Sequence, residues 1–362
     1  MLSRVANAIY WMSRYVERAE NVARFVDVNL NLALDFPEAT PQWAPLVATT
    51  GDTELFEKRY GEVSRQNVLS FLTFDLEAPN SIISCLARAR ENARSVREVI
   101  SSEMWEQVNR AYLMVMEAAA SRTPVANPHD FFTAVKQASQ LFVGVTDLTM
   151  SHNEGWHFGR LARLLERADK TSRILDVKYY LLLPGVADVG TTVEELQWAA
   201  VLRSASAFEM YRKRHGSITP AKVVGFLMLS RTFPRSVRFC LDKGERSLHA
   251  ITGTPVGSWT SAVEREMGRV VADLAYAETS VMLQNGLHQH IDDLQQRMNR
   301  VGDAVYATFF AMKPIDAVAE DHRASLPPSQ TQTQTQTQTQ GEASVRPATR
   351  TDAGRGRIAT AT

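Results

Sequence analysis

The sequence predicts an all-α protein, a helical bundle built from two pseudo-symmetric half-repeats and followed by a disordered C-terminal tail. Three observations lead to this prediction: long stretches of helical periodicity, a lack of convincing alternating strands, and one Glu-Arg-Ala-acid segment that occurs twice. The chain has 362 residues, of which 44% are hydrophobic, so it has enough apolar side chains for a sizeable core.

The clearest periodicity lies in the first helix. Nine apolar residues from Val5 to Ala33 follow alternating spacings of four and three. Ser3 is placed to cap this helix, and Pro37 lies just beyond its end. At 1.5 Å per residue, the nine positions would form one stripe about 45 Å long. Further long helical patterns cover roughly residues 79–121, 128–150, 153–183, 192–212, 220–250 and 259–312.

A duplicated segment supports the half-repeats. Residues 11–28 align without a gap with residues 160–177, at an offset of 149 positions. The matched polar residues are Arg14 with Arg163, Glu17 with Glu166, Arg18 with Arg167, Glu20 with Asp169, Arg24 with Arg173, and Asp27 with Asp176. Chance is a poor explanation for so many shared polar positions, so we interpret the two segments as copies.

A second match strengthens this interpretation. Residues 71–86 match residues 226–241 at an offset of 155 positions, and one loop insertion accounts for the difference between the two offsets. We therefore expect half-repeats at about 1–150 and 151–312, packed around an approximate two-fold axis into one domain.

The composition changes at the end of the chain. Residues 313–362 are rich in Pro, Ser, Thr, Gln and Gly, with an alternating tract from Thr331 to Gln340. Such a segment has almost nothing to bury, so we expect it to be a disordered, low-complexity tail.

Charge and cysteine content narrow the function classes. The 40 basic residues equal the 40 acidic ones, which argues against a general nucleic-acid-binding surface. Cys85 and Cys240 both lie in apolar helical contexts, as expected of core cysteines in a reducing compartment. Charged residues interrupt the N-terminus, and no apolar run is long enough to span a membrane, so we expect a soluble cytoplasmic protein.

One polar face of the first helix carries Glu17, Glu20, Asn21 and Arg24, opposite the apolar stripe. Apolar residues also border this face, so the helix is apolar on more than one side and we expect it to be buried. Buried carboxylates need partners. The i,i+4 pairs Glu20–Arg24 and Asp169–Arg173 supply local ones. Glu17 and Glu166 have no equally good basic partner four residues further along the helix. We therefore expect their side chains to point across the pseudo-symmetry axis.

Two interpretations of these charges stay open. They form either an interior salt-bridge network that sets helix register, or a polar cleft in which arginines hold an anionic ligand. In the second case Glu17 and Glu166 are the candidate acid/base groups. The candidate ligand-binding residues are Arg14, Glu20, Arg24, Arg94, Glu103, Arg163, Asp169 and Arg173. For Arg94 and Glu103, a charged outer face is equally easy to defend.

No motif points to a metal or a cofactor. Glu154 and His157 have the Glu-x-x-His spacing of bundle di-iron sites, but no second such motif is present. The sequence also lacks a phosphate-cradling glycine loop, a Gly-x-Ser-x-Gly elbow and a cysteine nucleophile with a placed histidine. We therefore expect neither a metal centre nor a bound cofactor.

Longer motifs resemble a known family. The opening MLSRVANAIYWMSRYVERAENVAR resembles the start of the bacterial alpha-E domain family. Four more landmarks follow in the right order, at residues 89–109, 155–184, 198–216 and 226–241. The resemblance covers residues 1 to about 312, and the family's glutamates fall on Glu17, Glu20, Glu103 and Glu166, with Asp169 at the acid position of the second copy.

The resemblance also implies a functional context. The family is a domain of unknown function, encoded beside or fused to a circularly permuted ATP-grasp protein and often near a transglutaminase-like cysteine peptidase. It implies an accessory helical subunit of an ATP-dependent peptide-ligating or peptide-modifying system, with an ATP-grasp partner acting in trans. An enzyme that uses Glu17 or Glu166 as acid/base groups, and a purely structural scaffold, are the alternatives.

Overall fold

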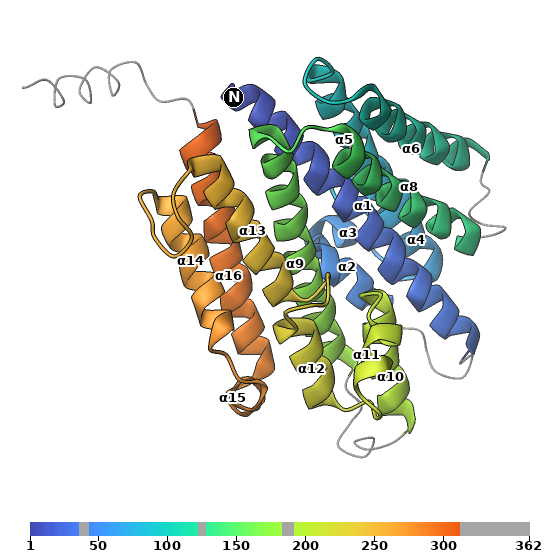
Figure 1. The fold of residues 1–362 in the computed structure, drawn as a ribbon. Helices are drawn as coiled ribbons and strands as arrows, with labels where there is room; N and C mark the ends of the chain where they lie inside the picture. The colour runs from blue at the N-terminus through green and yellow to red at the C-terminus, as the bar shows by residue number, and fades with distance from the viewer. Residues whose placement is uncertain (36–42, 122–127, 183–191, 312–362) are drawn as a thin grey trace, which may run out of the picture. The chain divides into compact units, whose positions relative to one another are not determined.

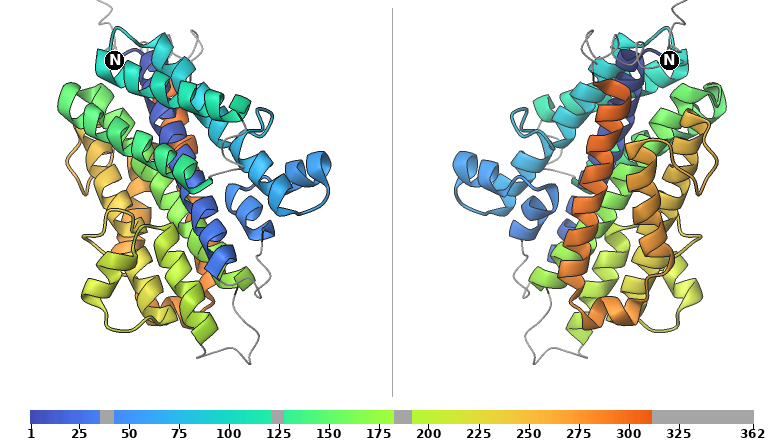
Figure 2. Two further views of the ribbon diagram at one scale, coloured as in Figure 1. Left: turned by 90° about the vertical axis from the view of Figure 1, so that its right-hand side faces the viewer. Right: turned by 90° about the vertical axis from the view of Figure 1, so that its left-hand side faces the viewer.

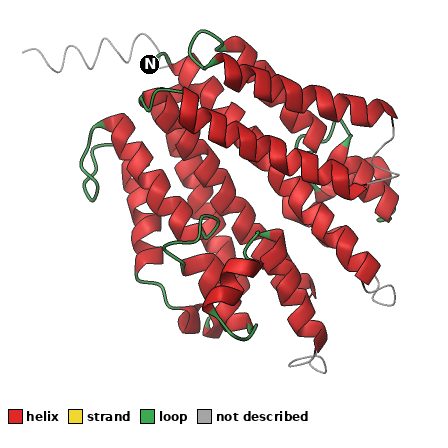
Figure 3. Ribbon diagram, turned by 45° about the vertical axis from the view of Figure 1, so that its right-hand side comes forward, coloured by secondary structure: helices red, strands yellow, loops and turns green. Residues whose placement is uncertain are grey.

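The computed structural model describes residues 1–35, 43–121, 128–182 and 192–311. Within these ranges the chain is helical and contains no strand (Figure 3), which confirms the all-α prediction. No helix among these residues is long and apolar enough to cross a membrane. The predicted tail, residues 313–362, lies outside the described residues.

The helices before residue 150 are α1 (Ser3–Asp35), α2 (Ala44–Thr50), α3 (Thr53–Tyr60), α4 (Arg65–Thr73), α5 (Ile82–Ser95), α6 (Ser102–Ser121) and α8 (Pro128–Thr149). Those after it are α9 (Glu154–Leu182), α10 (Thr192–Ser204), α11 (Phe208–Arg214), α12 (Pro220–Leu229), α13 (Val237–Thr252), α14 (Ala262–Ala275), α15 (Thr279–Gln284) and α16 (Leu287–Val305), with a π-helical turn at Tyr306–Phe310.

Four of the long helical patterns each hold more than one helix, because turns that periodicity does not reveal interrupt them. The pattern 220–250, for example, divides into α12 and α13. The hydroxyl of Ser236 caps α13 by accepting a hydrogen bond from the Phe239 amide. The patterns 79–121, 192–212 and 259–312 divide in the same way. The short helices α2 to α4 were not expected, since each is too short to show a clear period.

The longest helices, α1 and α9, lie side by side in the middle of the bundle and run in the same direction (Figure 1). The Met1 amino group contacts Glu154 at one end of this pair, and Arg14 contacts Glu166 farther along. Helices α5 and α8 pack against α1, while α13 and α16 pack against α9 (Figure 2). Helices α5 and α8 thus pack on α1 as α13 and α16 pack on α9.

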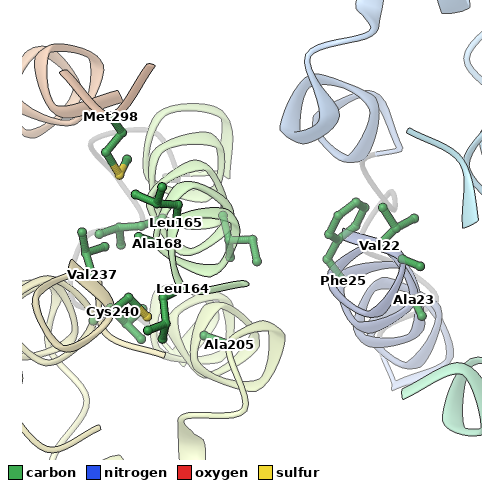
Figure 4. Packing of buried hydrophobic residues seen from close by; sticks show 14 of the residues in the cluster. Val22, Ala23, Phe25, Leu164, Leu165, Ala168, Ala205, Val237, Cys240 and Met298 are labelled. Atoms are coloured by element: carbon green, nitrogen blue, oxygen red, sulfur yellow. The ribbon is translucent and has the colours of Figure 1, made fainter. Parts of the chain in front are cut away.

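Apolar side chains fill the spaces between these helices. The predicted stripe of α1 is buried from Val5 to Leu30. Figure 4 shows Leu164, Leu165 and Ala168 of α9 beside Val237 and Cys240 of α13 and Met298 of α16. Cys85 and Cys240 are free thiols with no solvent exposure, which agrees with their expected place in the core.

Candidate functional site

Two glutamate–arginine pairs join α1 to α9 in a reciprocal way. Arg167 donates through Nε and Nη2 to the two carboxylate oxygens of Glu17, at 2.8 and 2.7 Å. Arg18 donates through Nε and Nη2 to the two oxygens of Glu166, at 2.6 and 2.9 Å. Glu17 is 1% exposed and Glu166 is fully buried. In each Glu-Arg dipeptide, the glutamate thus accepts from the arginine of the other helix, and the arginine donates to the glutamate of the other helix.

Further charged groups surround Glu166. We call Glu166, Arg14, Arg18, Asp169, Lys170 and Arg173 the Glu166 cluster. Arg14 Nε donates to Glu166 Oε2 at 2.8 Å. Lys170 Nζ lies 3.1 Å from Asp169 Oδ2 and 3.8 Å from Glu166 Oε1. Arg173 donates only through Nε, at 3.0 Å from both Asp169 oxygens.

A corresponding group surrounds Glu17. We call Glu17, Glu20, Asn21, Arg24, Arg167 and Arg235 the Glu17 cluster. Arg235, which precedes α13, donates to Glu17 Oε1 at 3.3 Å, to Asn21 Oδ1 at 3.2 Å and to Glu20 Oε1 at 2.6 Å. Arg24 pairs with Glu20 and also bonds to the Ser206 hydroxyl. Arg235 is therefore a buried cation that Glu17 and Glu20 share.

The surrounding cations keep the carboxyls of Glu166 and Glu20 ionised. Burial opposes ionisation of Glu166, but attraction to Arg18, Arg14 and Lys170 outweighs it and holds the pKa well below its usual range. In the same way Arg235 and Arg24 overcome the burial of Glu20 and lower its pKa to about 2. A general acid or base works best with a pKa near the operating pH. The geometry therefore favours a charge-pairing role for Glu166 over an acid/base role.

A polar pocket of about 400 Å³ opens beside the Glu166 cluster. Its wall is made of side chains from α1, α2, α9 and α16 and the turns after α2 and before α5: Arg14, Arg18, Thr50, Gly51, Asp52, Asn80, Leu165, Asp169, Lys170, Arg173, Met298 and Asn299. The volume lies in the range of small-molecule sites. We call this cavity the Glu166 pocket.

Arg173 and Arg14 bring unused hydrogen-bond donors to this pocket. The terminal nitrogens of Arg173 form no hydrogen bond with any described residue, since only its Nε contacts Asp169. Arg14 uses Nε for Glu166 and Nη1 for the Tyr10 hydroxyl, which leaves Nη2 without an acceptor among the described residues. Such guanidinium groups suit a carboxylate or a phosphate, which can accept two hydrogen bonds at once.

The structure separates the residues predicted to share one site. Arg14, Asp169 and Arg173 line the pocket, and Glu166 lies buried behind Arg14 and Arg18. Glu17, Glu20 and Arg24 belong to the Glu17 cluster and do not line it. The expected single cleft is therefore two adjoining clusters, of which the Glu166 cluster borders this pocket.

Arg163 on α9 aligns in sequence with Arg14 on α1, and it lies near Glu17. Its Nε is buried and has no hydrogen-bond partner among the described residues. Burial and the neighbouring charge of Arg167 both lower its pKa. Arg163 thus stands next to Glu17 without bonding to it, because Arg167 and Arg235 already occupy that carboxylate.

Arg94 and Glu103, two of the candidate ligand-binding residues, lie on the outer face, which was the alternative for both, and not in the site. Both are exposed, and Arg94 pairs with Glu91 on the outer face of α5. Their charges are solvated and need no interior partner.

Sequence reasoning also missed several site residues. Arg18 and Arg167 were visible in the repeated segment, but Lys170, Arg235, Asn80 and Asp52 were not recognised as part of a site. Asp52 and Asn80 gave no signal, because they lie in turns where no periodicity exists.

Glu154, which has the Glu-x-x-His spacing with His157, forms an ion pair with the N-terminus. Glu154 Oε2 lies 2.8 Å from the Met1 amino group. Across the described ranges, no three His, Cys, Asp or Glu side chains converge as metal ligands.

A family model named Alpha-E matches residues 1–310, and it describes a predicted α-helical domain with a conserved ER motif. The chain belongs to the Alpha-E family. The Glu17-Arg18 and Glu166-Arg167 dipeptides fit that description, and the reciprocal pairing of α1 with α9 gives such a motif a physical meaning. In this Alpha-E domain, the two Glu-Arg dipeptides join helix α1 to helix α9.

Two relatives are uncharacterized proteins of Mycobacterium bovis and Mycobacterium tuberculosis. Each is 23% identical to this Alpha-E chain over 337 residues, a match that covers 85% of this chain and 37% of the relative. The chain thus spans little more than a third of the length of these relatives. No solved structure matches the chain.

Proposed function

We propose that this Alpha-E chain is a non-catalytic accessory subunit of an ATP-dependent peptide-ligating or peptide-modifying system. In this proposal the Glu166 pocket binds an anionic group of a substrate or of a partner protein. The observation that carries it is the set of unused guanidinium donors of Arg14 and Arg173 at the wall of a polar pocket.

The charges around the pocket support binding over catalysis. The carboxylates of Glu166 and Asp169 are already paired with cations, and both have lowered pKa values because those cations outweigh the effect of burial. Neither is suited to exchange a proton near neutral pH. The free guanidinium groups of Arg14 and Arg173 are donors, which bind anions without changing them.

The link to a peptide-ligating or peptide-modifying system comes from the family resemblance. Alpha-E domains are associated with a circularly permuted ATP-grasp protein, and the carboxylate of a peptide is the group that such a ligase activates. A subunit that holds a carboxylate fits this context, and we place it in the cytoplasm beside its ligase.

Internal duplication is part of the same proposal. Besides the two clusters, Asp27 of α1 contacts His129 of α8 at 2.8 Å, and Asp176 of α9 contacts His288 of α16 at 2.7 Å. Equivalent acids therefore contact histidines on equivalent helices. We propose that an ancestral half-repeat was copied and that one copy kept a pocket.

Titration with glutarate, a simple dicarboxylate, tests the binding step in phosphate-free buffer. We expect a Kd of about 1 mM or tighter for the unmodified chain. Arg173→Gln should weaken binding about tenfold or more, since hydrogen bonds to charged groups are worth about 1.5–3 kcal/mol. The matched control is Arg269→Gln on α14, where the side chain is 65% exposed. If glutarate does not bind, or if both variants bind it equally well, the pocket is not an anion site.

Co-purification tests the proposed system. We expect a circularly permuted ATP-grasp protein from the same organism to co-purify with this chain, and ligation assays to run faster when the chain is present. Arg173→Gln should lose the acceleration and Arg269→Gln should keep it. Equal ligation rates with and without the chain would contradict an accessory role.

A further inference from the structure

The Glu166 pocket also presents a carboxylate that has no cation of its own. Asp52, at the start of α3, accepts a hydrogen bond from Asn80 Nδ2 at 2.8 Å. Among the described residues, no Lys, Arg or His nitrogen lies within 4.0 Å of its carboxylate. Asp169, the other acid in the wall, is paired with both Lys170 and Arg173. Asp52 is therefore the acid of this wall that is available to a ligand.

The counterpart of Asp52 in the other half is apolar. Gly51 and Ser206 are equivalent positions, 155 residues apart, and both have a left-handed backbone, with φ of +82° and +50°. The next residue is Asp52 in the first case and Ala207, which is fully buried, in the second. The carboxylate thus occurs in the half that has the pocket.

An amide separates Asp52 from the nearest cation of the cluster. Arg18 Nη1 donates to Asn80 Oδ1 at 2.7 Å, and the Asn80 amide nitrogen donates to Asp52. Asn80 therefore bridges Arg18 and Asp52, which form no direct ion pair with each other. The pocket consequently offers an acceptor for a positive group next to donors for negative groups.

The charge balance agrees with a ligand of mixed charge. Four cationic side chains line the pocket, namely Arg14, Arg18, Lys170 and Arg173. Three carboxylates oppose them, those of Asp52, Asp169 and the buried Glu166. A bare polyanion would meet repulsion from Asp52, whereas a ligand with one ammonium and two carboxylates would match both signs.

We infer that the Glu166 pocket binds an acidic α-amino acid, with its ammonium group at Asp52 and its carboxylates at the free donors of Arg14 and Arg173. This inference rests on the proposed anion-binding function and names the ligand class for the same pocket. The volume of about 400 Å³ holds such a molecule together with bound water.

Calorimetric titration of the full chain with L-glutamate and with glutarate tests the inference, because the two ligands differ by the amino group. We expect glutamate to bind about tenfold more tightly, the usual value of one charge-assisted hydrogen bond. Asp52→Asn should remove this preference and leave glutarate binding unchanged or stronger. Asp52→Ala, which copies the other half, should behave in the same way.

The outcomes separate this inference from the proposed function. If glutarate binds but glutamate gains nothing in the unmodified chain, the pocket is an anion site and the amino-acid inference is wrong. The same holds if Asp52→Asn keeps the preference for glutamate. If neither ligand binds the unmodified chain, both the inference and the proposed function fail. The comparison of the two ligands needs no variant, so a poorly folding substitution cannot obscure it.

Discussion

The Glu17 cluster and the Glu166 cluster have the same reciprocal core and differ in where the next cation comes from. In the Glu17 cluster, Arg235 reaches in from the turn before α13 and binds both glutamates. At the equivalent position the Glu166 cluster has Asn80, and its extra cation is Lys170 on α9, where the Glu17 cluster has Asn21. The extra cation therefore comes from a different position in each cluster.

This difference has a steric consequence. A long guanidinium side chain fills the space at Arg235, whereas the short amide of Asn80 borders a pocket. A second difference acts in the same direction. The Ser206 hydroxyl accepts a hydrogen bond from Arg24, but Gly51 has no hydroxyl to offer Arg173. The turn residues Asn80 and Gly51 thus distinguish the cluster with free donors from the Glu17 cluster, which has Arg235 and Ser206 at these positions.

The largest expected effect comes from removing the Glu17 charge. Glu17→Gln leaves Arg167 and Arg235 buried without their carboxylate, which should cost about 3–5 kcal/mol in the free energy of unfolding. Glu166→Gln should cost less, because Arg14 and Arg18 line a pocket that admits water. Urea denaturation of the two variants measures both costs. A larger loss of stability for Glu166→Gln would contradict the idea that the Glu17 cluster is closed to water and the Glu166 cluster borders a pocket.

Two substitutions test whether the cation of the Glu17 cluster can move from position 235 to position 21. Arg235→Asn should destabilise the protein by about 3 kcal/mol, because Glu17 and Glu20 lose a shared buried partner. Adding Asn21→Lys reproduces the arrangement of Lys170 and Asn80. We expect the double variant to recover at least about 1 kcal/mol, as positive coupling between neighbouring residues. Additive losses in the same denaturation experiment would show that the two positions are not exchangeable.

Acid should weaken both clusters through their carboxyls. Glu20 has a pKa of about 2 and a usual value of 4.5, because Arg235 and Arg24 outweigh its burial. A lowered folded-state pKa contributes stability that is complete above the unfolded-state pKa and is lost as the pH falls through the folded-state pKa. For Glu20 this contribution is on the order of 3 kcal/mol. The urea concentration at the unfolding midpoint should therefore decrease as the pH is lowered from 5 to 2. A midpoint that does not change over this pH range would disprove the charge pairing.

The smallest effect is expected at the turn after α2. Gly51→Ser copies Ser206 and supplies a hydroxyl toward Arg173, whose Nη1 lies 3.9 Å from where a Cβ would stand. Glutarate should then bind a few-fold more weakly, since one free donor gains an internal partner. A stability loss of about 1 kcal/mol is expected from the positive φ. Unchanged affinity would remove Gly51 from the explanation of the open pocket.

Helical periodicity was enough to predict the all-α fold and the buried polar face of α1. Glu17 and Glu20 were expected to be buried because apolar residues flank them on both sides of the helix, and they are buried. The partners Arg18 and Arg167 were not assigned, because adjacent residues on one helix do not face each other and only the α1–α9 pairing brings them to the opposite glutamate.

The pocket was beyond the reach of the sequence pattern for a different reason. Asp52, Asn80 and Arg235 all lie in turns between helices, where side-chain direction follows from the path of the chain and not from a repeating period. Arg94 and Glu103 could not be assigned to the interior or to the surface, since a charged helix face is compatible with either solvent or an ionic interior.

The side-chain NMR signals of the arginine Nε–H groups offer the most direct test of the difference between the clusters. Assigned through single Arg→Lys variants, these signals can be followed while glutarate is added. We expect the signals of Arg14 and Arg173 to shift with a common binding curve, while those of Arg24 and Arg235 stay in place. Equal shifts in both clusters, or shifts confined to Arg24 and Arg235, would contradict this expectation.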